Sequence, residues 1–211
     1  TPKGVRSLIL APTRELAVQI GKSFQVYGRH LKIKQAVIYG GVRPAIQIRA
    51  LSRGVDILVA TPGRLLDLLN QRQLRLDKVG VLVLDEADRM LDMGFLPDIK
   101  KICSAIPANR QTMLFSATLP SEIVKLSRKF LDDPVKVTVN PPSSTVDKIE
   151  QKVLFVDREN KSALLESILE EDESIQRVLI FTRTKHGANR IAKRLSKIKI
   201  STEAIHGNKS Q

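Results

Sequence analysis

The sequence lacks the residues that build disulfide frameworks and multi-cysteine metal centres. Its 211 residues include one cysteine, Cys103, which excludes an intrachain disulfide and a zinc site made of several cysteines. Low cysteine content is typical of proteins in a reducing compartment, so we expect a cytoplasmic location. No apolar stretch approaches the ~20 residues that a membrane-spanning helix needs. The first residues also do not resemble a secretory leader.

Aromatic residues are also scarce, at 4% of the chain with no tryptophan. Proteins that hold single-stranded nucleic acid by stacking bases on aromatic side chains usually contain more of them. Acidic residues are outnumbered, with 22 Asp and Glu against 35 Lys and Arg, a net charge of +13 that is concentrated before residue 140. This excess favours a polyanionic partner, such as nucleic acid bound through its phosphates. A basic protein with no such partner has the same composition.

The hydrophobic residues, 42% of the chain, are arranged as short apolar runs that alternate with segments of helical spacing. Continuous apolar strands between helices predict an α/β fold with a mostly parallel sheet. The expected strands are 7–11, 36–39, 57–60, 81–84, 112–115 and 135–139. The expected helices are 15–27, 44–51, 64–70, 97–105 and 121–130.

Residues 140–147 read NPPSSTVD, which we interpret as an extended polar linker. The alternation then resumes, with expected strands at 151–156, 178–181 and 202–205 and expected helices at 161–169 and 187–195. We therefore predict one domain at 1–139 and a second at 148–211. About two βα repeats do not complete a doubly wound sheet, so we expect the second domain to be truncated at its C-terminal side.

The most informative stretch is VLVLDEADRM at 81–90, where an apolar run leads into the carboxylates of Asp85, Glu86 and Asp88. In open α/β sheets, ligands bind beyond the carboxyl ends of the strands. This placement predicts a Walker-B pair, in which Asp85 holds Mg²⁺ through water and Glu86 orients or deprotonates the attacking water. The alternative is a helix N-terminus, where the helix dipole favours acidic residues.

A Walker-B pair normally works with a phosphate loop of the form G-x-x-x-x-G-K-[ST]. Gly21-Lys22-Ser23 matches the end of that pattern. However, Leu16 stands where the first glycine is required, and the triplet falls inside an expected helix. We predict that this triplet is not a nucleotide-binding loop, and no other segment of the sequence matches the pattern.

Three further groups of residues follow expected strands. Gly40 and Gly41 would allow a sugar–phosphate chain to approach the backbone closely, although a glycine pair is equally typical of an ordinary turn. Thr13 and Arg14, like Thr61 to Arg64, combine hydroxyl, guanidinium and helix N-terminal N–H groups, which commonly bind phosphate. Both segments could instead be a capping threonine followed by a surface arginine.

These motifs resemble those of the DEAD-box RNA helicases, and they occur in the order found in that family. The similar segments are PTRELA at 12–17, GG at 40–41, TPGR at 61–64, DEAD at 85–88, SAT at 116–118, LIFTRTK at 179–185 and HGNKSQ at 206–211. The amino-acid sequence at 89–95, 181–189 and 205–211 is most similar to that of the bacterial RhlE-type subgroup.

The resemblance implies two RecA-like domains that close over ATP–Mg²⁺ and RNA and couple ATP hydrolysis to local unwinding of RNA duplexes. Single-stranded or duplex RNA would be bound through its phosphate backbone. The residues implied in RNA binding are Thr13, Arg14, Gly41, Thr61, Arg64 and Thr184. Asp88 would hydrogen-bond Ser116 and Thr118, linking the nucleotide site to domain closure. Thr118 could instead cap the helix that follows Pro120.

The sequence also departs from the family pattern. The family's adenine-reading Q motif and phosphate loop precede PTRELA, and the motifs that supply an arginine finger and further RNA contacts follow HGNKSQ; none of them is present. We therefore expect a helicase fragment that is inactive as an ATPase on its own. One alternative is a basic RNA-binding or annealing module that never hydrolyses nucleotide, but such a module would not need the DEAD and SAT motifs. The other alternative is a DNA-directed relative of the same superfamily.

Overall fold

The computed structural model describes residues 4–139, 150–171 and 175–208. The chain divides into two compact units, Thr1–Val137 and Thr138–Gln211, and each unit is described here by itself. The predicted linker at 140–147 lies outside the described residues. None of the helices in the described parts of the chain is long and apolar enough to cross a membrane.

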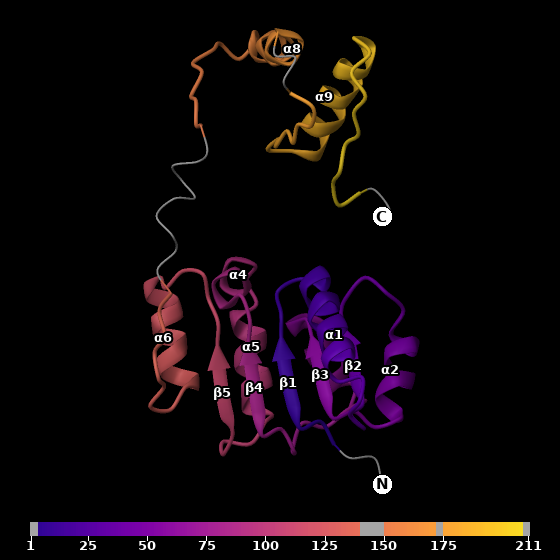
Figure 1. The fold of residues 1–211 in the computed structure, drawn as a ribbon, viewed down its shortest axis with the longest axis vertical. Helices are drawn as coiled ribbons and strands as arrows, with labels where there is room; N and C mark the ends of the chain where they lie inside the picture. The colour runs from indigo at the N-terminus through magenta and orange to yellow at the C-terminus, as the bar shows by residue number, and fades with distance from the viewer. Residues whose placement is uncertain (1–3, 140–149, 172–174, 209–211) are drawn as a thin grey trace. The chain divides into compact units, whose positions relative to one another are not determined.

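The first unit is built on a parallel five-stranded sheet in the order β2-β3-β1-β4-β5. The strands are β1 (Ser7–Leu10), β2 (Gln35–Ile38), β3 (Ile57–Ala60), β4 (Val81–Leu84) and β5 (Gln111–Leu114). Ser7 lies opposite both Ile57 and Val81, and the outer strands pair in the same register. All five strands therefore end level, and the loops that follow them meet at one edge of the sheet (Figure 1).

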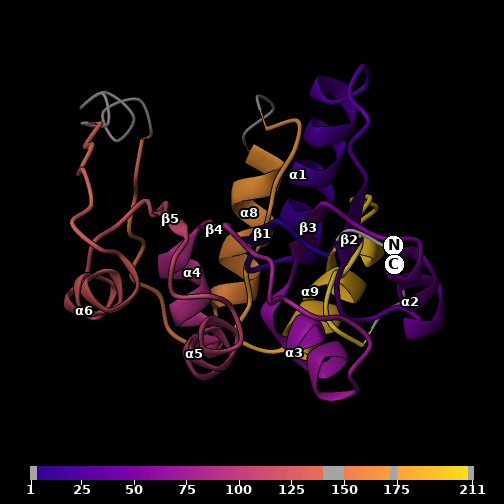
Figure 2. The same ribbon diagram turned by 90° about the horizontal axis from the view of Figure 1, so that it is seen from below.

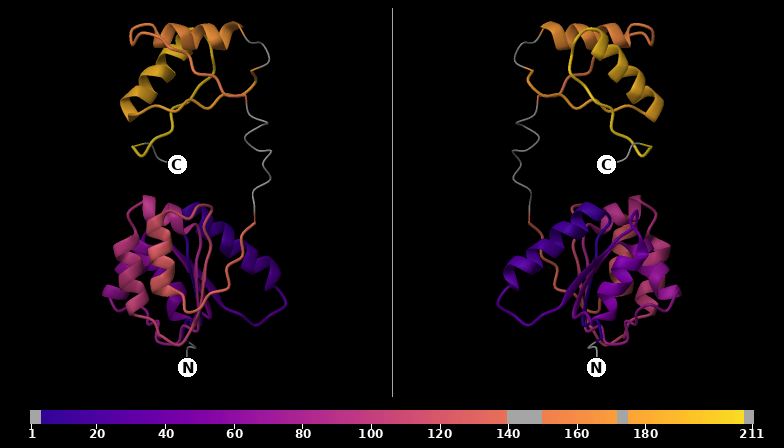
Figure 3. Two further views of the ribbon diagram at one scale, coloured as in Figure 1. Left: turned by 90° about the vertical axis from the view of Figure 1, so that its left-hand side faces the viewer. Right: turned by 90° about the vertical axis from the view of Figure 1, so that its right-hand side faces the viewer.

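Helices cover both faces of this sheet. They are α1 (Arg14–Tyr27), α2 (Pro44–Ser52), α3 (Pro62–Asn70), α4 (Ala87–Asp92), α5 (Leu96–Ser104) and α6 (Ser121–Phe130). Helix α1 lies on one face, and α3 and α5 lie on the other (Figures 2 and 3). Leu8 and Leu58 point into the larger core, which α2 to α6 complete, whereas Ile9 and Val59 pack with Ala17 of α1. Burial on both faces explains why the strands read as continuous apolar runs.

Gly21 sits in the middle of α1, which places the Gly21-Lys22-Ser23 triplet inside a helix, as predicted. A Cβ atom added to Gly21 would lie 2.4 Å from Cγ2 of Val37 on β2, closer than real Cβ contacts allow. The glycine therefore serves close packing of α1 against β2. Its position gives no support to a phosphate-binding role.

Most predicted elements of the first unit are confirmed, with ends that differ by at most two residues. The strand expected at 135–139 is wrong, because those residues form no strand and the side chains of Val135, Val137 and Val139 are exposed. An apolar, β-branched sequence favours a strand only when a neighbouring strand accepts its backbone hydrogen bonds. The six-residue helix α4, which follows the DEAD motif directly, was not among the expected helices.

The second unit contains α8 (Lys161–Glu171) and α9 (Lys185–Lys197). An ion pair between Glu166 of α8 and Arg194 of α9 joins the two helices. The strands expected at 151–156, 178–181 and 202–205 are wrong: the described residues of this unit form no strand. Segments 178–182 and 202–205 line one hollow with α9 but make no strand ladder. Without a ladder most of their large apolar side chains stay exposed, as Phe181 does at 87%.

We predict that Gly21→Ala destabilises the first unit. Overpacking against Val37 costs about 1–3 kcal/mol, which exceeds the ~1 kcal/mol that alanine contributes through helix propensity. The free energy of unfolding should fall by about 1 kcal/mol in urea titrations followed by circular dichroism. Ser23→Ala is the matched control, because Ser23 is exposed on the same helix and its hydroxyl only contacts the Gln19 carbonyl. An alanine at position 21 that stabilises the protein would contradict this packing role.

Candidate functional site

The carboxylates of the DEAD motif lie where β4 ends. Asp85 is held there by its backbone N–H, which donates to the Leu10 carbonyl at the end of β1, 3.0 Å away. Glu86 adopts left-handed backbone angles, φ 48° and ψ 55°, and occupies the N-cap position of α4 without a side-chain cap bond. That conformation costs a residue other than glycine about 1–2 kcal/mol. It turns the chain sharply from strand to helix and leaves two adjacent carboxylates at the sheet edge.

Asp85 is partly buried, as is Glu86. Burial raises the pKa of its carboxyl group, the hydrogen bond from the Glu86 backbone N–H at 3.0 Å lowers it, and the charge of Glu86 raises it further. The net pKa is above the usual value, so a bound cation would stabilise the ionised form. The side chain of Glu86 also pairs with Arg89, 3.3 Å away.

The donor set suits Mg²⁺. Within the described residues no group of three His, Cys, Asp or Glu side chains could enclose a metal ion. Mg²⁺ usually keeps several waters and takes only one or two carboxylates, with substrate phosphates completing its coordination. Asp85 and Glu86 fit that arrangement better than they fit a metal site made entirely by protein.

Asp88 connects α4 to the SAT segment after β5. Its Oδ2 accepts hydrogen bonds from the backbone N–H of Thr118 at 2.9 Å and from the Thr118 hydroxyl at 2.7 Å. The Ser116 hydroxyl accepts from the Asp88 backbone N–H at 3.2 Å and donates to the Thr118 carbonyl at 2.7 Å. Helix α6 begins after Pro120 without a side-chain cap, so Thr118 bonds Asp88 and does not cap that helix.

These contacts also set the ionisation of Asp88. Partial burial acts to raise the pKa of its carboxyl group, but the hydrogen bonds from Thr118, the Arg89 backbone and Ser116 together outweigh burial and leave the pKa below its usual value. Asp85 and Asp88 therefore have pKa values shifted in opposite directions although three residues separate them.

The loop after β2 is held by two side chains. Arg64, an expected RNA ligand, donates from Nη1 to Oε1 of Gln47 at 3.1 Å and from Nη2 to the Val42 carbonyl at 3.1 Å, and its side chain is only 11% exposed. Gln47 is 7% exposed and donates to the Tyr39 carbonyl at 3.0 Å. The sequence motifs do not include Gln47. Its only signal is a polar residue one helical turn before the buried Leu51.

Arg14 and Gly41 lie together beside this loop. The Arg14 guanidinium carbon is 5.9 Å from the centre of the Tyr39 ring, and its Nε lies 3.4 Å from the Glu15 carboxylate. Gly41 has a φ of +81°, and a Cβ added there would come within 3.5 Å of Arg14 Nη1. The structure thus brings the PTRELA arginine and the glycine pair to one place at the sheet edge.

The three threonines predicted to bind RNA begin helices. Thr13 caps α1 by accepting from the Leu16 backbone N–H at 3.2 Å, and Thr184 caps α9 in the second unit by accepting from Gly187 at 3.0 Å. Thr61 occupies the N-cap position of α3 but makes no side-chain cap bond, and it is buried. The capping alternative is therefore confirmed for Thr13 and wrong for Thr61; Thr184, for which it was not raised, also caps its helix. The RNA-binding role of all three stays a prediction.

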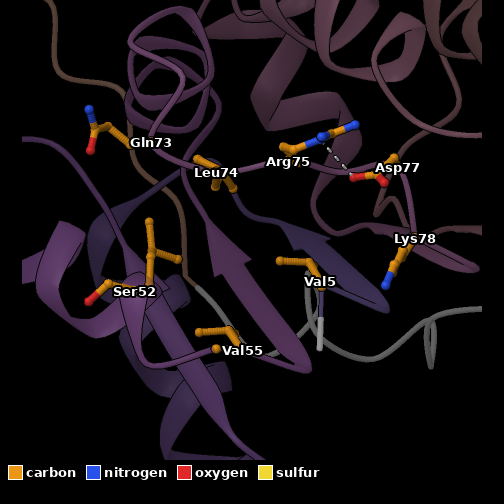
Figure 4. A pocket seen from close by; sticks show the side chains of 11 residues that line it. Val5, Ser52, Val55, Gln73, Leu74, Arg75, Asp77 and Lys78 are labelled. Carbon is orange, nitrogen blue, oxygen red and sulfur yellow. Dashed lines mark ion pairs between the residues drawn. The ribbon is translucent and has the colours of Figure 1, made fainter. Parts of the chain in front are cut away.

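A separate hollow of about 400 Å³ lies at the opposite edge of the sheet, before the strands begin (Figure 4). Its wall includes Val5, Val55 and Lys78, together with Arg75 and Asp77, whose side chains pair at 3.5 Å. It contains none of the predicted site residues. The site residues of the first unit therefore lie at the other edge, where the strands end.

A family model described as DEAD/DEAH box helicase matches residues 1–126. The chain belongs to the DEAD/DEAH box helicase family. Among its relatives, DEAD-box ATP-dependent RNA helicase 20 of Oryza sativa subsp. japonica is 46% identical over 205 residues, covering 97% of this chain and 42% of the relative. ATP-dependent RNA helicase dbp2 of Schizosaccharomyces pombe is 47% identical over 207 residues, covering 97% and 38%. RNA helicase CrhR of Synechocystis is 43% identical over 212 residues, covering 100% and 43%.

A solved structure supports the same family. The crystal structure of a DEAD box protein from the hyperthermophile Methanococcus jannaschii superposes with a TM-score of 0.63 at 36% identity, covering 99% of this chain and 55% of that one. The expected RecA-like sheet with flanking helices is thereby confirmed. This DEAD-box chain spans about two fifths of the length of the three relatives above. These relatives come from a plant, a fungus and a cyanobacterium and are similarly close to the chain. The predicted RhlE-type subgroup is therefore not confirmed.

We predict that the contact between Asp88 and Thr118 makes stability depend on acidity. The pKa of Asp88 is lower in the folded than in the unfolded chain, so its stabilisation is complete above the unfolded value of 3.8 and is lost as the pH falls through the lower folded value. Asp88→Asn should cost about 1 kcal/mol at pH 7, since hydrogen bonds to an exposed carboxylate are weakened by solvent.

That cost should shrink below about pH 4, as measured by urea unfolding of both proteins at several pH values. Thr118→Val is the matched control, because it removes one donor to the same carboxylate and should lose part of the pH dependence. An Asp88→Asn cost that stays constant from pH 7 to pH 3 would contradict the assignment.

Proposed function

We propose that this chain is part of an ATP-dependent RNA helicase whose first unit supplies the metal-binding and water-orienting carboxylates and part of the RNA-binding surface. The observation that carries the proposal is the set of hydrogen bonds between Asp88 and the SAT residues Ser116 and Thr118. They join the two motifs that, by the family resemblance, connect nucleotide hydrolysis to movement. The names of the relatives, ATP-dependent RNA helicases among them, support the same conclusion.

In this proposal, ATP and Mg²⁺ are the cofactors. Asp85 holds the metal through water, and Mg²⁺ when bound would neutralise phosphate charge. Glu86 orients or deprotonates the attacking water, and its pairing with Arg89 limits the directions that its carboxylate can take. Asp88, which accepts hydrogen bonds from Thr118, links the nucleotide site to the SAT segment.

RNA is bound through groups that any sequence shares. Thr13, Arg14, Gly41 and Thr61 follow three neighbouring strands, β1, β2 and β3, and Thr184 belongs to the second unit. The net charge of +13 favours a phosphate partner. Arg64 contributes through the loop that it holds.

Several finer assignments belong to the same proposal. They are the division into RecA-like domains at 1–139 and 148–211, a cytoplasmic location, and local unwinding of RNA duplexes. Placement in the RhlE-type subgroup rests only on the amino-acid sequence at 89–95, 181–189 and 205–211. No feature of the described residues favours the non-hydrolysing RNA-binding module over the helicase.

We predict salt-dependent RNA binding that is nearly independent of base sequence. Each phosphate that the chain neutralises on a single strand should contribute about −0.7 to the slope of log K against log salt concentration. Fluorescence anisotropy with labelled adenine-rich and uracil-rich 12-mers should give affinities within about threefold of each other, because backbone contacts carry no base information. Strong discrimination between 12-mers of equal length would contradict backbone recognition, and a DNA 12-mer tests the DNA-directed alternative.

We predict that Glu86→Gln, in the natural protein that contains this chain, lowers RNA-stimulated ATP turnover about 100-fold or more without weakening RNA binding. Loss of a positioned general base typically has an effect of this size. The 211-residue chain on its own should show little turnover, because its sequence contains no phosphate loop. Phosphate-release assays measure both, and unchanged turnover in the Glu86→Gln protein would contradict the proposed role of Glu86.

A further inference from the structure

The two carbonyl groups that flank the glycine pair are joined by a chain of three hydrogen bonds. Gln47 donates to the Tyr39 carbonyl on one side of Gly40-Gly41 at 3.0 Å, and Arg64 donates to the Val42 carbonyl on the other side at 3.1 Å. Between them, Arg64 Nη1 donates to Gln47 Oε1 at 3.1 Å. The loop is therefore clamped from α2 and α3 at once.

Both side chains of this clamp are turned inward. Gln47 is buried, and Arg64 is 11% exposed with both terminal nitrogens bonded to the protein and its Nε 3.8 Å from the Asp67 carboxylate. An arginine that binds a phosphate chain needs guanidinium N–H groups that are exposed to solvent. Arg14, at 31% side-chain exposure on the other side of the loop, is better placed for that role.

The glycine pair needs such a clamp. Glycine loses more conformational freedom on ordering than any other residue, and nothing lies within 4 Å of the position that a Gly40 Cβ would take. A loop that is ordered before its ligand arrives binds more tightly than one that must be ordered during binding.

We infer that Gln47 and Arg64 are positioning residues that fix the Gly40-Gly41 backbone for contact with a nucleic-acid phosphate chain, and that Arg64 is not itself a phosphate ligand. This inference deepens the proposed function and depends on it for the identity of the ligand. It assigns a role to Gln47, which no sequence motif marks, and it replaces the direct role predicted for Arg64.

The test uses the full 211-residue chain and a fluorescein-labelled 12-nucleotide oligouridylate at several salt concentrations. Gln47→Met removes the clamp without changing charge, and Arg64→Lys keeps the charge but not the two-armed geometry. Each should weaken binding about tenfold with an unchanged salt slope, because no charged phosphate contact is lost. Gln35→Met is the matched control: it removes a glutamine-to-carbonyl bond, to Gly21 at 2.8 Å, from the start of the strand that leads to the same loop.

Gln35→Met should bind RNA within twofold of the wild type even where it lowers stability as much as Gln47→Met does. A direct phosphate role for Arg64 predicts the reverse pattern, in which Arg64→Lys binds almost normally and Gln47→Met binds equally well or more tightly; that result would overturn the inference. Equal losses in Gln47→Met and Gln35→Met would also overturn it, since the effect would then be general destabilisation.

A measurement without RNA separates this inference from the proposed function. In the free chain, ¹⁵N relaxation should show lower order parameters for Gly40 and Gly41 in Gln47→Met than in the wild type or in Gln35→Met. If the wild type does not bind RNA, the proposed function fails while this loop measurement still tests the clamp. Unchanged order parameters in Gln47→Met overturn the clamp even if RNA binds.

Discussion

Parallel pairing in a single register is the constraint on which the rest of the first unit depends. Because Ser7, Ile57 and Val81 start level, Leu10, Ala60 and Leu84 end level, and each following loop begins at the same height. Polar groups from distant parts of the sequence therefore reach one edge. A one-residue slip of β4 would turn its apolar side chains to the opposite faces and move Asp85 away from the Leu10 carbonyl that holds it.

At that edge, neighbouring carboxylates have opposite environments. Asp85 is partly withdrawn from water beside Glu86, which raises its pKa, whereas Asp88 receives enough hydrogen bonds to lower its pKa. The left-handed conformation of Glu86 makes this separation possible, because it ends the strand abruptly and starts α4 so that Asp88 faces the SAT segment. The same short turn thus leaves the Asp85 carboxylate suited to binding a cation, whereas the Asp88 carboxylate is held by hydrogen bonds from the protein.

The sequence predicted the elements whose stability is decided within the first unit's core. Strands at 57–60 and 81–84 were found with their true bounds, because runs buried on both faces are continuously apolar. Segments 135–139 and 178–181 have similar composition but no ladder, since pairing depends on a neighbour that composition does not reveal. Motifs identified the carboxylates and the SAT residues, but nothing in the local sequence shows that Arg64 faces Gln47 and Val42.

The strand order would keep the two proposed anionic ligands, RNA and ATP, apart at one edge of the sheet. Loops after β1, β2 and β3, which carry the proposed RNA contacts, occupy one half, and loops after β4 and β5, which carry the carboxylates and SAT, occupy the other. RNA phosphates would be repelled by Asp85, Glu86 and Asp88 if the two groups were interleaved. Neighbouring strands are about 4.8 Å apart, so the outer loops of the two halves lie farther apart than the ~8 Å screening length of physiological salt. Within this sheet only β1 and β4 pair across the two halves, so Thr13 and Arg14 after β1 and Asp85 after β4 are the site residues beside the boundary.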